Sequence, residues 1–127
     1  MKHQSNFPTL SSIVIGTKDI RKAKEFYVKV FGISIEEEDK NYISARCIDG
    51  THIEIEENSE NRFPNWEKHN IGSYKNSEFN VIDIFSFLET VKLNGGKIVS
   101  EPKKRPWGSY GAEIQDVDGN IFLIVQK

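Results

Sequence analysis

The stretch Ser12-Ile13-Val14-Ile15-Gly16-Thr17-Lys18-Asp19 opens the pattern that decides the fold of this chain. Its first four residues follow the alternation of a β-strand. Asp19 stands where a helix N-cap belongs, because its carboxylate can accept hydrogen bonds from free backbone N–H groups of the first turn. Residues 20–30 then carry apolar side chains at helical spacing, and Gly32 is placed to end the helix.

The same order of elements returns in the second half of the chain. Residues 76–81 alternate as a strand does, Asp83 stands at the cap position, and an apolar helical face runs up to Gly95-Gly96. Asp83 and Gly96 each lie 64 residues after their counterparts in the first half. A repeat of this kind predicts two copies of one supersecondary unit.

Each half ends in a predicted β-hairpin with an Asp-Gly turn, at Gly50 and at Gly119. Such a turn could be a two-residue hairpin loop or a type I turn whose glycine forms a G1 bulge. Only the bulged register, which pairs Arg46 with His52 in the first hairpin, places all the apolar side chains of the hairpin on one face. We therefore expect left-handed glycines at both turns.

The repeat predicts an α+β fold of two βαβββ modules whose half-sheets curve toward each other, with both helices covering one face of the sheets. We expect one domain over residues 1–127, with module one at about 8–58, a connection at 59–73 and module two at about 74–127. The concave face is expected to carry Ser12, Val14, Ser44, Arg46, His52, Glu54, Glu56, Asn76, Glu78, Asn80, Glu113, Gln115, Ile121, Leu123 and Val125.

Composition excludes several classes of protein. With 37% hydrophobic and 28% charged residues the chain is an ordinary globular one, and its net charge of −2 gives no attraction to nucleic acid or to an anionic membrane. No apolar stretch approaches the roughly 20 residues of a membrane span or resembles a signal peptide. The lone Cys47 cannot form an internal disulfide, so we expect a buried structural thiol in a cytoplasmic protein.

These residues resemble the vicinal oxygen chelate superfamily, which contains glyoxalases, bleomycin-resistance proteins, fosfomycin-resistance enzymes and ring-cleaving dioxygenases. The motifs that carry the resemblance are residues 12–19, Ala23, Phe26-Tyr27, Phe31-Gly32, Pro106-Trp107-Gly108 and Asp116-Val117-Asp118-Gly119-Asn120. The closing motifs look like those of bleomycin-resistance-like members. The resemblance implies paired βαβββ modules that form a curved, U-shaped mixed sheet with the helices on its convex face, commonly in a homodimer whose modules pair across chains.

Metal-dependent members of that superfamily hold a divalent ion with four inward-facing strand side chains, usually His and Glu. Carried over onto this chain, the four positions fall on Ser12, Glu54, Asn76 and Leu123. Only Glu54 keeps a good ligand type, and such a site needs about three protein ligands with lone pairs. We therefore expect no metal and no other cofactor.

A displaced metal site is the alternative, because carboxylates on the concave face could bind a hard cation. The candidates are His52, Glu54, Glu56, Glu78 and Glu113. The competing interpretation is that Glu54 pairs with Arg46, while His52 and Glu56 lie in solvent at the strand edges. Glu54 and Glu113 are also candidates for an acid and base pair.

Aromatic residues give the best sign of ligand contact. Trp107 and Tyr110 follow a basic, Pro-bounded loop and could stack on a planar ligand, although Trp107 could instead cover the sheet edge. Phe63, Trp66 and Tyr74 could cover the cleft or bury a dimer contact.

The predicted function is the binding of an amphipathic, cationic or aromatic small molecule by a metal-free homodimer. The alternatives are a glyoxalase-like lyase, isomerase or dioxygenase with a divalent metal near Glu54, and a filled cup with a purely structural role. Nucleic acid and membranes are not expected partners. The expected ligand-binding residues are Ser12, Arg46, His52, Glu54, Asn76, Trp107, Tyr110, Glu113 and Leu123.

Overall fold

The computed structural model describes residues 6–57 and 71–127, and within them the βαβββ unit occurs twice. The first copy consists of β1 (Ile13–Gly16), α1 (Ile20–Phe26) with its π-helical continuation η1 (Tyr27–Phe31), β2 (Ser34–Asp39), β3 (Tyr42–Arg46) and β4 (His52–Glu56). The second consists of β5 (Ser73–Asn80), α2 (Ile84–Leu93), β6 (Lys97–Lys104), β7 (Tyr110–Gln115) and β8 (Ile121–Gln126).

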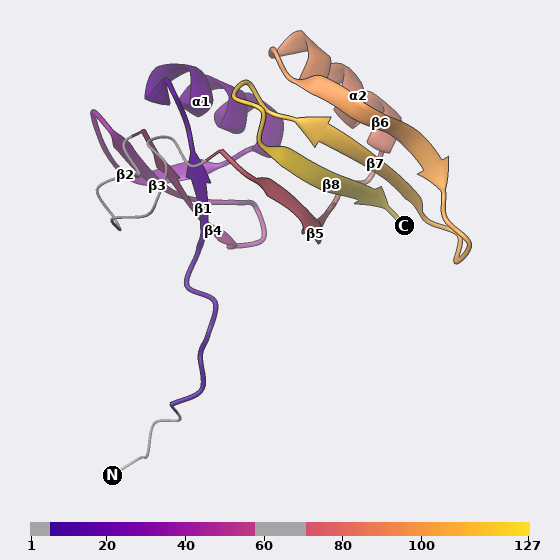
Figure 1. Ribbon diagram of the computed structural model, residues 1–127, viewed down its shortest axis with the longest axis horizontal. Coiled ribbons are helices and arrows are strands. Elements are labelled where there is room, and N and C mark those ends of the chain that lie inside the picture. Colours follow the sequence, from indigo (N-terminus) through magenta and orange to yellow (C-terminus); the bar gives the residue numbers. More distant parts are fainter. Residues whose placement is uncertain (1–5, 58–70) are drawn as a thin grey trace.

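The two copies have the same sheet topology. The strand orders are β1-β4-β3-β2 and β5-β8-β7-β6, and in each sheet the first strand pairs in parallel with the last while the other pairs are antiparallel. Figure 1 shows both helices on the same side of the two sheets. The predicted α+β fold of two βαβββ modules is therefore confirmed, and we call the opposite side of both sheets the helix-free face.

Both helices begin at the predicted aspartates. The carboxylate of Asp19 accepts hydrogen bonds from the backbone of Arg21 and Lys22 at 3.0 and 3.3 Å, and Asp83 caps α2 in the same way. At the end of α2 the left-handed residue is Gly95, one position before the glycine that the 64-residue offset indicates. Gly96 is required for space instead, because a Cβ there would lie 2.6 Å from a methyl carbon of Val91.

The two hairpins have the predicted bulged register. Gly50 and Gly119 are left-handed, with φ of 91° and 102°, and Arg46 lies opposite His52. Gln115 likewise lies opposite Ile121 in the second hairpin. The isoleucines that this register assigns to the helix side are buried, so the predicted division into two faces is correct for both hairpins.

Strand β5 departs from the regular alternation expected for residues 76–81. It begins at Ser73, and its register against β8 jumps between Tyr74, which lies opposite Phe122, and Glu78, which lies opposite Leu123. Residues 75–77 therefore form a bulge, which is a common device at the edge of a sheet. Because of it, Glu78 rather than Asn76 is the cross-strand neighbour of Leu123.

An aromatic cluster joins the two modules on the helix side. The ring of Phe31, at the end of η1, lies 5.4 Å from Phe79 and 5.2 Å from Phe122 of the second sheet. Tyr74 stacks on Phe122 at 5.2 Å and donates its hydroxyl to the main-chain oxygen of Val14 in β1 at 2.7 Å. Each such aromatic pair contributes about 0.5–1.5 kcal/mol beyond area burial, so the cluster holds the modules together. Tyr74 thus belongs to the core between the modules.

The turn between β7 and β8 adds polar contacts across the same junction. One carboxylate oxygen of Asp116 accepts from the backbone N–H groups of residues 118, 119 and 120, and the other accepts from the hydroxyl of Tyr27 at 2.5 Å. Asp118 accepts from the hydroxyl of Thr17 at 2.6 Å, and Asn120 donates to the main-chain oxygen of Gly16 at 2.9 Å. We call residues 116–120 the second turn and residues 47–51 the first turn.

Replacing Asp118 by alanine is expected to lower the free energy of unfolding by about 1–3 kcal/mol, because the buried Thr17 hydroxyl loses a charged acceptor. Urea unfolding checks this. The matched control is Asp49→Ala, since Asp49 has the equivalent place in the first turn but bonds within its own turn, to the backbone of Thr51 at 3.0 Å. We expect little change for that control, and equal losses in the two variants would contradict the role of the second turn.

Alkaline pH is expected to destabilise the protein through Tyr27 and Tyr74. Burial, followed by the charge of Asp116, raises the pKa of Tyr74 to about 12 and also raises the pKa of Tyr27, above the ordinary 10.0. A raised folded-state pKa means that the stabilisation is complete below about pH 10 and is lost as pH rises through the folded value. Urea unfolding with tyrosinate absorbance checks this. Ionisation of all four tyrosines near pH 10 without unfolding would contradict it.

Candidate functional site

The helix-free face of the first module carries a carboxylate held by two hydroxyl groups. Ser12, just before β1, donates its hydroxyl to one oxygen of Glu54 in β4, and Tyr42 of β3 donates to the other oxygen at 2.9 Å. All three side chains are half-buried. The register explains the grouping, because Glu54 lies opposite Val14 on one side and Ser44 on the other, and the two hydroxyl residues are two positions away along their own strands. We call these residues the Glu54 cluster.

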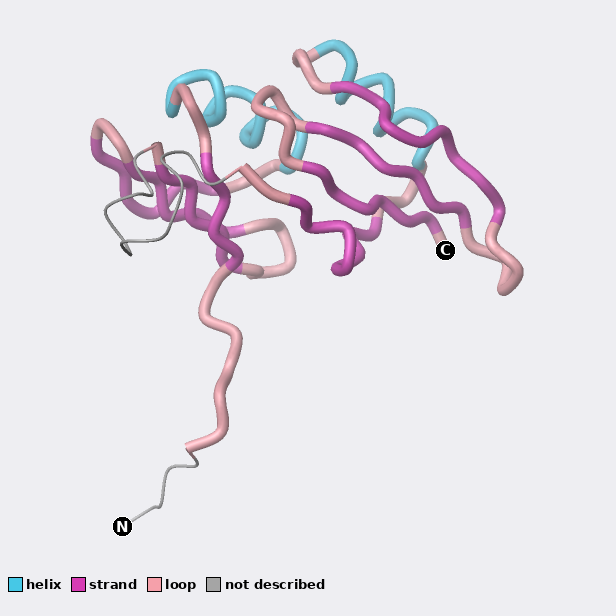
Figure 2. Tube along the Cα trace, viewed as in Figure 1, coloured by secondary structure: helices cyan, strands magenta, loops and turns pink. Residues whose placement is uncertain are grey.

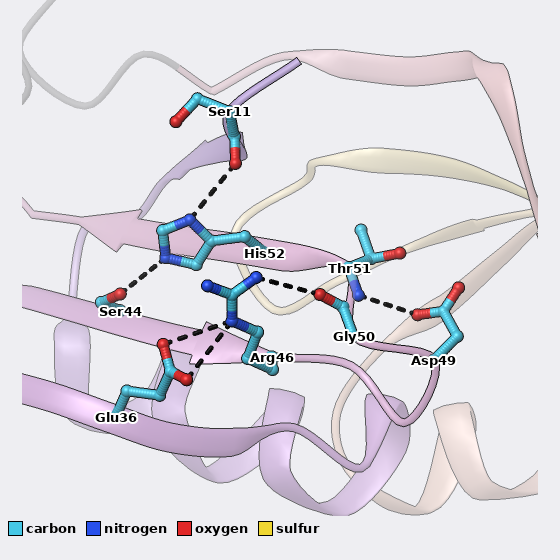
Figure 3. Close-up of polar contacts among 8 residues, drawn as sticks. All are labelled: Ser11, Glu36, Ser44, Arg46, Asp49, Gly50, Thr51 and His52. Atoms are coloured by element: carbon cyan, nitrogen blue, oxygen red, sulfur yellow. Dashed lines mark hydrogen bonds and ion pairs between the residues drawn. The ribbon is translucent and has the colours of Figure 1, made fainter. Parts of the chain in front are cut away.

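His52, the first residue of β4, lies beside this cluster and is half-buried. Figure 3 shows its two ring nitrogens facing opposite ways. One nitrogen lies 2.6 Å from the hydroxyl of Ser44, and the other lies 3.3 Å from the main-chain oxygen of Ser11. His52 therefore fixes the segment before β1 against β3 and β4.

Arg46 does not pair with Glu54, so that interpretation of the sequence is wrong. Its guanidinium reaches both carboxylate oxygens of Glu36 at 3.3 Å and the main-chain oxygen of Gly50 at 3.1 Å (Figure 3). Glu36 is available because β2 has a bulge at this position, between the pairs formed by Ile35 and Glu37. Arg46 thus links β2 to the first turn, and its charge is paired with that of Glu36.

In the second module each carboxylate of the helix-free face has a basic partner. Glu113 accepts from the hydroxyl of Ser100 at 2.8 Å and lies 3.5 Å from the ammonium of Lys75. The hydrogen bond from Ser100 is the largest cause of the lowered pKa of Glu113; burial opposes it, and the charge of Lys75 adds to the lowering. Glu54 and Glu113 are held by separate partners in separate sheets, so their pairing as acid and base remains a prediction.

Arg105 lies at the end of the second sheet and contacts several residues there. It donates to Glu78 at 3.1 Å and to the hydroxyl of Ser109 at 3.0 Å, and its side chain lies over Gly111 on the helix-free side. Its guanidinium carbon is 4.8 Å from the ring centroid of Trp107, a cation–π distance. Trp107 is 71% exposed, so the indole is held in place on one side and open to solvent.

Tyr110 lies apart from the other predicted ligand contacts. Its ring meets Phe85 of α2 edge-on at 5.8 Å, which places it on the helix side of the sheet. Asn76 is exposed in the β5 bulge, and Leu123 lies between Glu78 and Glu113 on the helix-free face. Phe63 and Trp66 lie outside the described residues.

Two residues of the helix-free face, Tyr42 and Arg105, were not among the site residues predicted from the sequence. Tyr42 lies two residues before Ser44 in β3, so the alternation of the strand puts its side chain on the same face as those of Ser44 and Arg46. Extending this alternation to Tyr42 would have predicted its position. Arg105 was included only as part of a basic loop, and its contact with Glu78 depends on the bulge in β5, for which the sequence gives no clear signal.

The residues at the four carried-over metal positions do not fit a divalent ion. Leu123 has no lone pair, Asn76 sits in a bulge, and the hydroxyl of Ser12 is bonded to the carboxylate of Glu54. Within residues 6–57 and 71–127, no group of three or more His, Cys, Asp or Glu side chains is arranged to hold a metal ion. We therefore assign no step of a reaction to a metal here.

Cys47, the first residue of the first turn, packs against the core but is half-buried, not fully buried as expected. Burial, followed by the charge of Asp49, raises the pKa of its thiol. A raised pKa keeps the thiol protonated at neutral pH and lowers its reactivity. These properties agree with a structural role for this side chain.

Glu54→Gln is expected to lower the pKa of Tyr42 toward its ordinary 10.0 without reaching it. Burial is the largest cause of the raised pKa and remains in the variant, whereas the hydrogen bond with the carboxylate and its charge are lost. Titration of the phenol by carbon NMR of the ring checks this. Glu36→Gln removes the same charge elsewhere on this face and should leave the titration unchanged; an equal shift in both variants would contradict the assignment.

With this geometry described, comparison with known proteins gives the family. Residues 9–124 match the Glyoxalase/Bleomycin resistance protein/Dioxygenase superfamily. The uncharacterized protein YetH of Bacillus subtilis is 24% identical over 119 residues, which cover 91% of this chain and 95% of that protein.

Solved structures of low identity share the fold. A glyoxalase-related enzyme from Fulvimarina pelagi superposes with a TM-score of 0.77 at 16% identity, covering 95% of this chain and 89% of that one. The fosfomycin resistance protein FosX from Listeria monocytogenes gives 0.69 at 19% identity, covering 95% and 94%. The family match spans most of the chain, and the chain therefore belongs to the Glyoxalase/Bleomycin resistance protein/Dioxygenase superfamily.

Proposed function

We propose that this protein is a metal-free, bleomycin-resistance-like binding protein of the cytoplasm that holds an amphipathic or aromatic small molecule on its helix-free face. The observation that carries the proposal is the Glu54 cluster. The one carboxylate left at the carried-over metal positions accepts hydrogen bonds from Ser12 and Tyr42 instead of facing other metal ligands. Binding without chemistry needs no such ligands.

Trp107 and Arg105 support an aromatic ligand. The guanidinium holds one part of the indole in place, while most of the ring surface is open to solvent. A ring that is held before binding loses little conformational entropy when a planar ligand stacks on it, and stacking of this kind is worth about 0.5–1.5 kcal/mol beyond area burial. Ile121 and Leu123 offer apolar contact on the same face.

The charges of this face favour an amphipathic rather than a strongly cationic ligand. Glu78 and Glu113 in the second module are each bound to a basic side chain, Arg105 and Lys75. The charges of these two carboxylates are thereby compensated within the second module. An amphipathic ligand, with polar groups beside an apolar body, matches such a face.

The segment before β1 supports a homodimer. Figure 2 shows it extending away from the body of the molecule, and it carries Phe7 and Leu10, which are 84% and 82% exposed. Burying two large apolar side chains against a second copy would be favourable by about 25 cal/mol per Å² of apolar surface.

The described residues have no helix with the length and apolar character needed to cross a bilayer.

Trp107→Ala is expected to weaken the binding of a planar aromatic antibiotic by roughly three- to tenfold, because stacking contributes about 0.5–1.5 kcal/mol. Isothermal titration of the whole chain against bleomycin and against planar aromatic antibiotics measures this. Phe85→Ala is the matched control, since Phe85 is 56% exposed but lies on α2, on the opposite side of the sheet. Equal effects of the two variants, or no binding at all, would contradict the proposal.

The same titration distinguishes the proposed function from the enzymatic alternative, which is a lyase, isomerase or dioxygenase with a metal near Glu54. A binding protein of the proposed kind keeps its affinity after treatment with a chelator and contains no stoichiometric Zn, Ni, Mn or Fe. Stoichiometric metal that is lost in Glu54→Ala would support the alternative and overturn the metal-free function.

A further inference from the structure

We propose that a cavity between the two helices binds a small amphipathic carboxylate. The cavity measures about 320 Å³, a volume at the lower end of the range for small-molecule sites. It is lined by Lys22, Glu25, Phe26 and Lys29 of the first helix and its continuation, and by Leu93, Asn94 and Val117 at the end of α2 and in the second turn. Both helices lie on the side of the sheets opposite the helix-free face (Figure 1), so this site goes beyond the function proposed above.

The shape of the cavity depends on a close approach of the chain at the end of α2. A Cβ on Gly96 would lie 2.9 Å from a ring carbon of Phe26, and a Cβ on the left-handed Gly95 would lie 3.3 Å from a methyl carbon of Val117. The two glycines therefore let the main chain pass close to both side chains. The second turn is held against the first module by its own carboxylates, so the walls are in place before a ligand binds.

The charged side chains that line the cavity are two lysines and one glutamate, which leaves one positive charge. Lys29 and Glu25 form an ion pair at 3.1 Å, so their charges compensate each other. In the part of the chain that the structure describes, the ammonium of Lys22 has no hydrogen bond or ion pair. The side-chain amide of Asn94 donates one proton to the main-chain oxygen of Thr90 at 2.8 Å and has a second proton to donate. These donors favour an anion.

Negative groups near the cavity are bonded within the protein. The carboxylates on either side of Val117 accept hydrogen bonds from hydroxyl groups of the first module. The main-chain oxygens of residues 90–92, at the C-terminal end of α2, accept backbone N–H groups of residues 94–96. These groups therefore oppose an anion less than unbonded ones would.

The remaining lining residues offer apolar contact. Leu93 lines the cavity although it is 84% exposed, and Phe26 and Val117 add apolar surface beside it. A ligand with one anionic end and a short apolar body matches this combination. A carboxylate carries the single charge that Lys22 balances. A phosphate monoester carries about −1.5 to −2 at neutral pH and would meet the carboxylate of Glu25 with a larger charge.

Octanoate, octanol and octylammonium share one apolar chain and differ in the head group, so they test the inference. Titration of the full chain, followed by proton–nitrogen NMR, is expected to show octanoate binding about fivefold more tightly than octanol, because an exposed ion pair contributes about that much. Octylammonium should bind no more tightly than octanol. The signals of Leu93, Asn94 and Val117 should shift, whereas that of Leu123 on the helix-free face should not.

Two lysine variants separate the site from a general effect of charge. Lys22→Gln should remove the preference for octanoate over octanol. Lys24→Gln removes an equal charge from the same helix, but Lys24 pairs with Glu38 of β2 outside the cavity, so this variant should keep the preference. Leu93→Ala should weaken octanoate and octanol by the same factor, because it removes only apolar contact. Circular dichroism checks that each variant is folded.

Four outcomes would overturn the inference. They are equal binding of octanoate and octanol, tighter binding of octylammonium than of octanol, equal effects of the two lysine variants, and an absence of octanoate binding. Signals that shift only on the helix-free face would also overturn it, because the carboxylate would then share the site of the proposed function. The antibiotic titration with Trp107→Ala tests that function separately.

Discussion

The carboxylate of Asp116 is the contact on which the arrangement of the two modules depends. It is buried, accepts three backbone N–H groups of its own turn, and binds the hydroxyl of Tyr27 and the side-chain amide of Asn120. A buried carboxylate without such partners would be very costly, so the turn and the first helix have to take up these positions together. The ring of Tyr27 also packs against Phe31 and Phe122, so one side chain joins this carboxylate to the aromatic cluster.

The two Asp-Gly turns have the same backbone register but different roles, and the flanking residues explain the difference. In the first turn Cys47 and Thr51 take the places of Asp116 and Asn120, so these two positions offer neither a carboxylate nor a side-chain amide, and the carboxylate of Asp49 bonds within its own turn. Its tip is open to solvent, with Ile48 at 93% exposed. The same hairpin motif therefore has an exposed tip in the first module, whereas in the second module it joins the two modules.

The sequence was sufficient to predict the repeat, the capping aspartates and the bulged hairpins, because each depends on local spacing or on the two-residue period of a strand. It was not sufficient to predict which charges pair. The sequence offers Arg46 carboxylates on both neighbouring strands, Glu36 on β2 and Glu54 on β4. The bulge in β2 brings Glu36 to Arg46, and that bulge depends on how the sheet packs. The bulge in β5 in the same way made Glu78, and not Asn76, the neighbour of Leu123.

The structural part of this chain and the site of its proposed function lie on opposite sides of the same sheets. The aromatic cluster lies on the helix side and the second turn at the junction, whereas the Glu54 cluster and the Arg105–Trp107 pair lie on the helix-free face. Because β-strand side chains alternate, a substitution on the helix-free face leaves the core contacts of its neighbours intact. Ser12 and Leu123 can therefore stand at the positions that the family resemblance indicates for metal ligands, without loss of the fold. The same alternation lets one scaffold serve several chemistries.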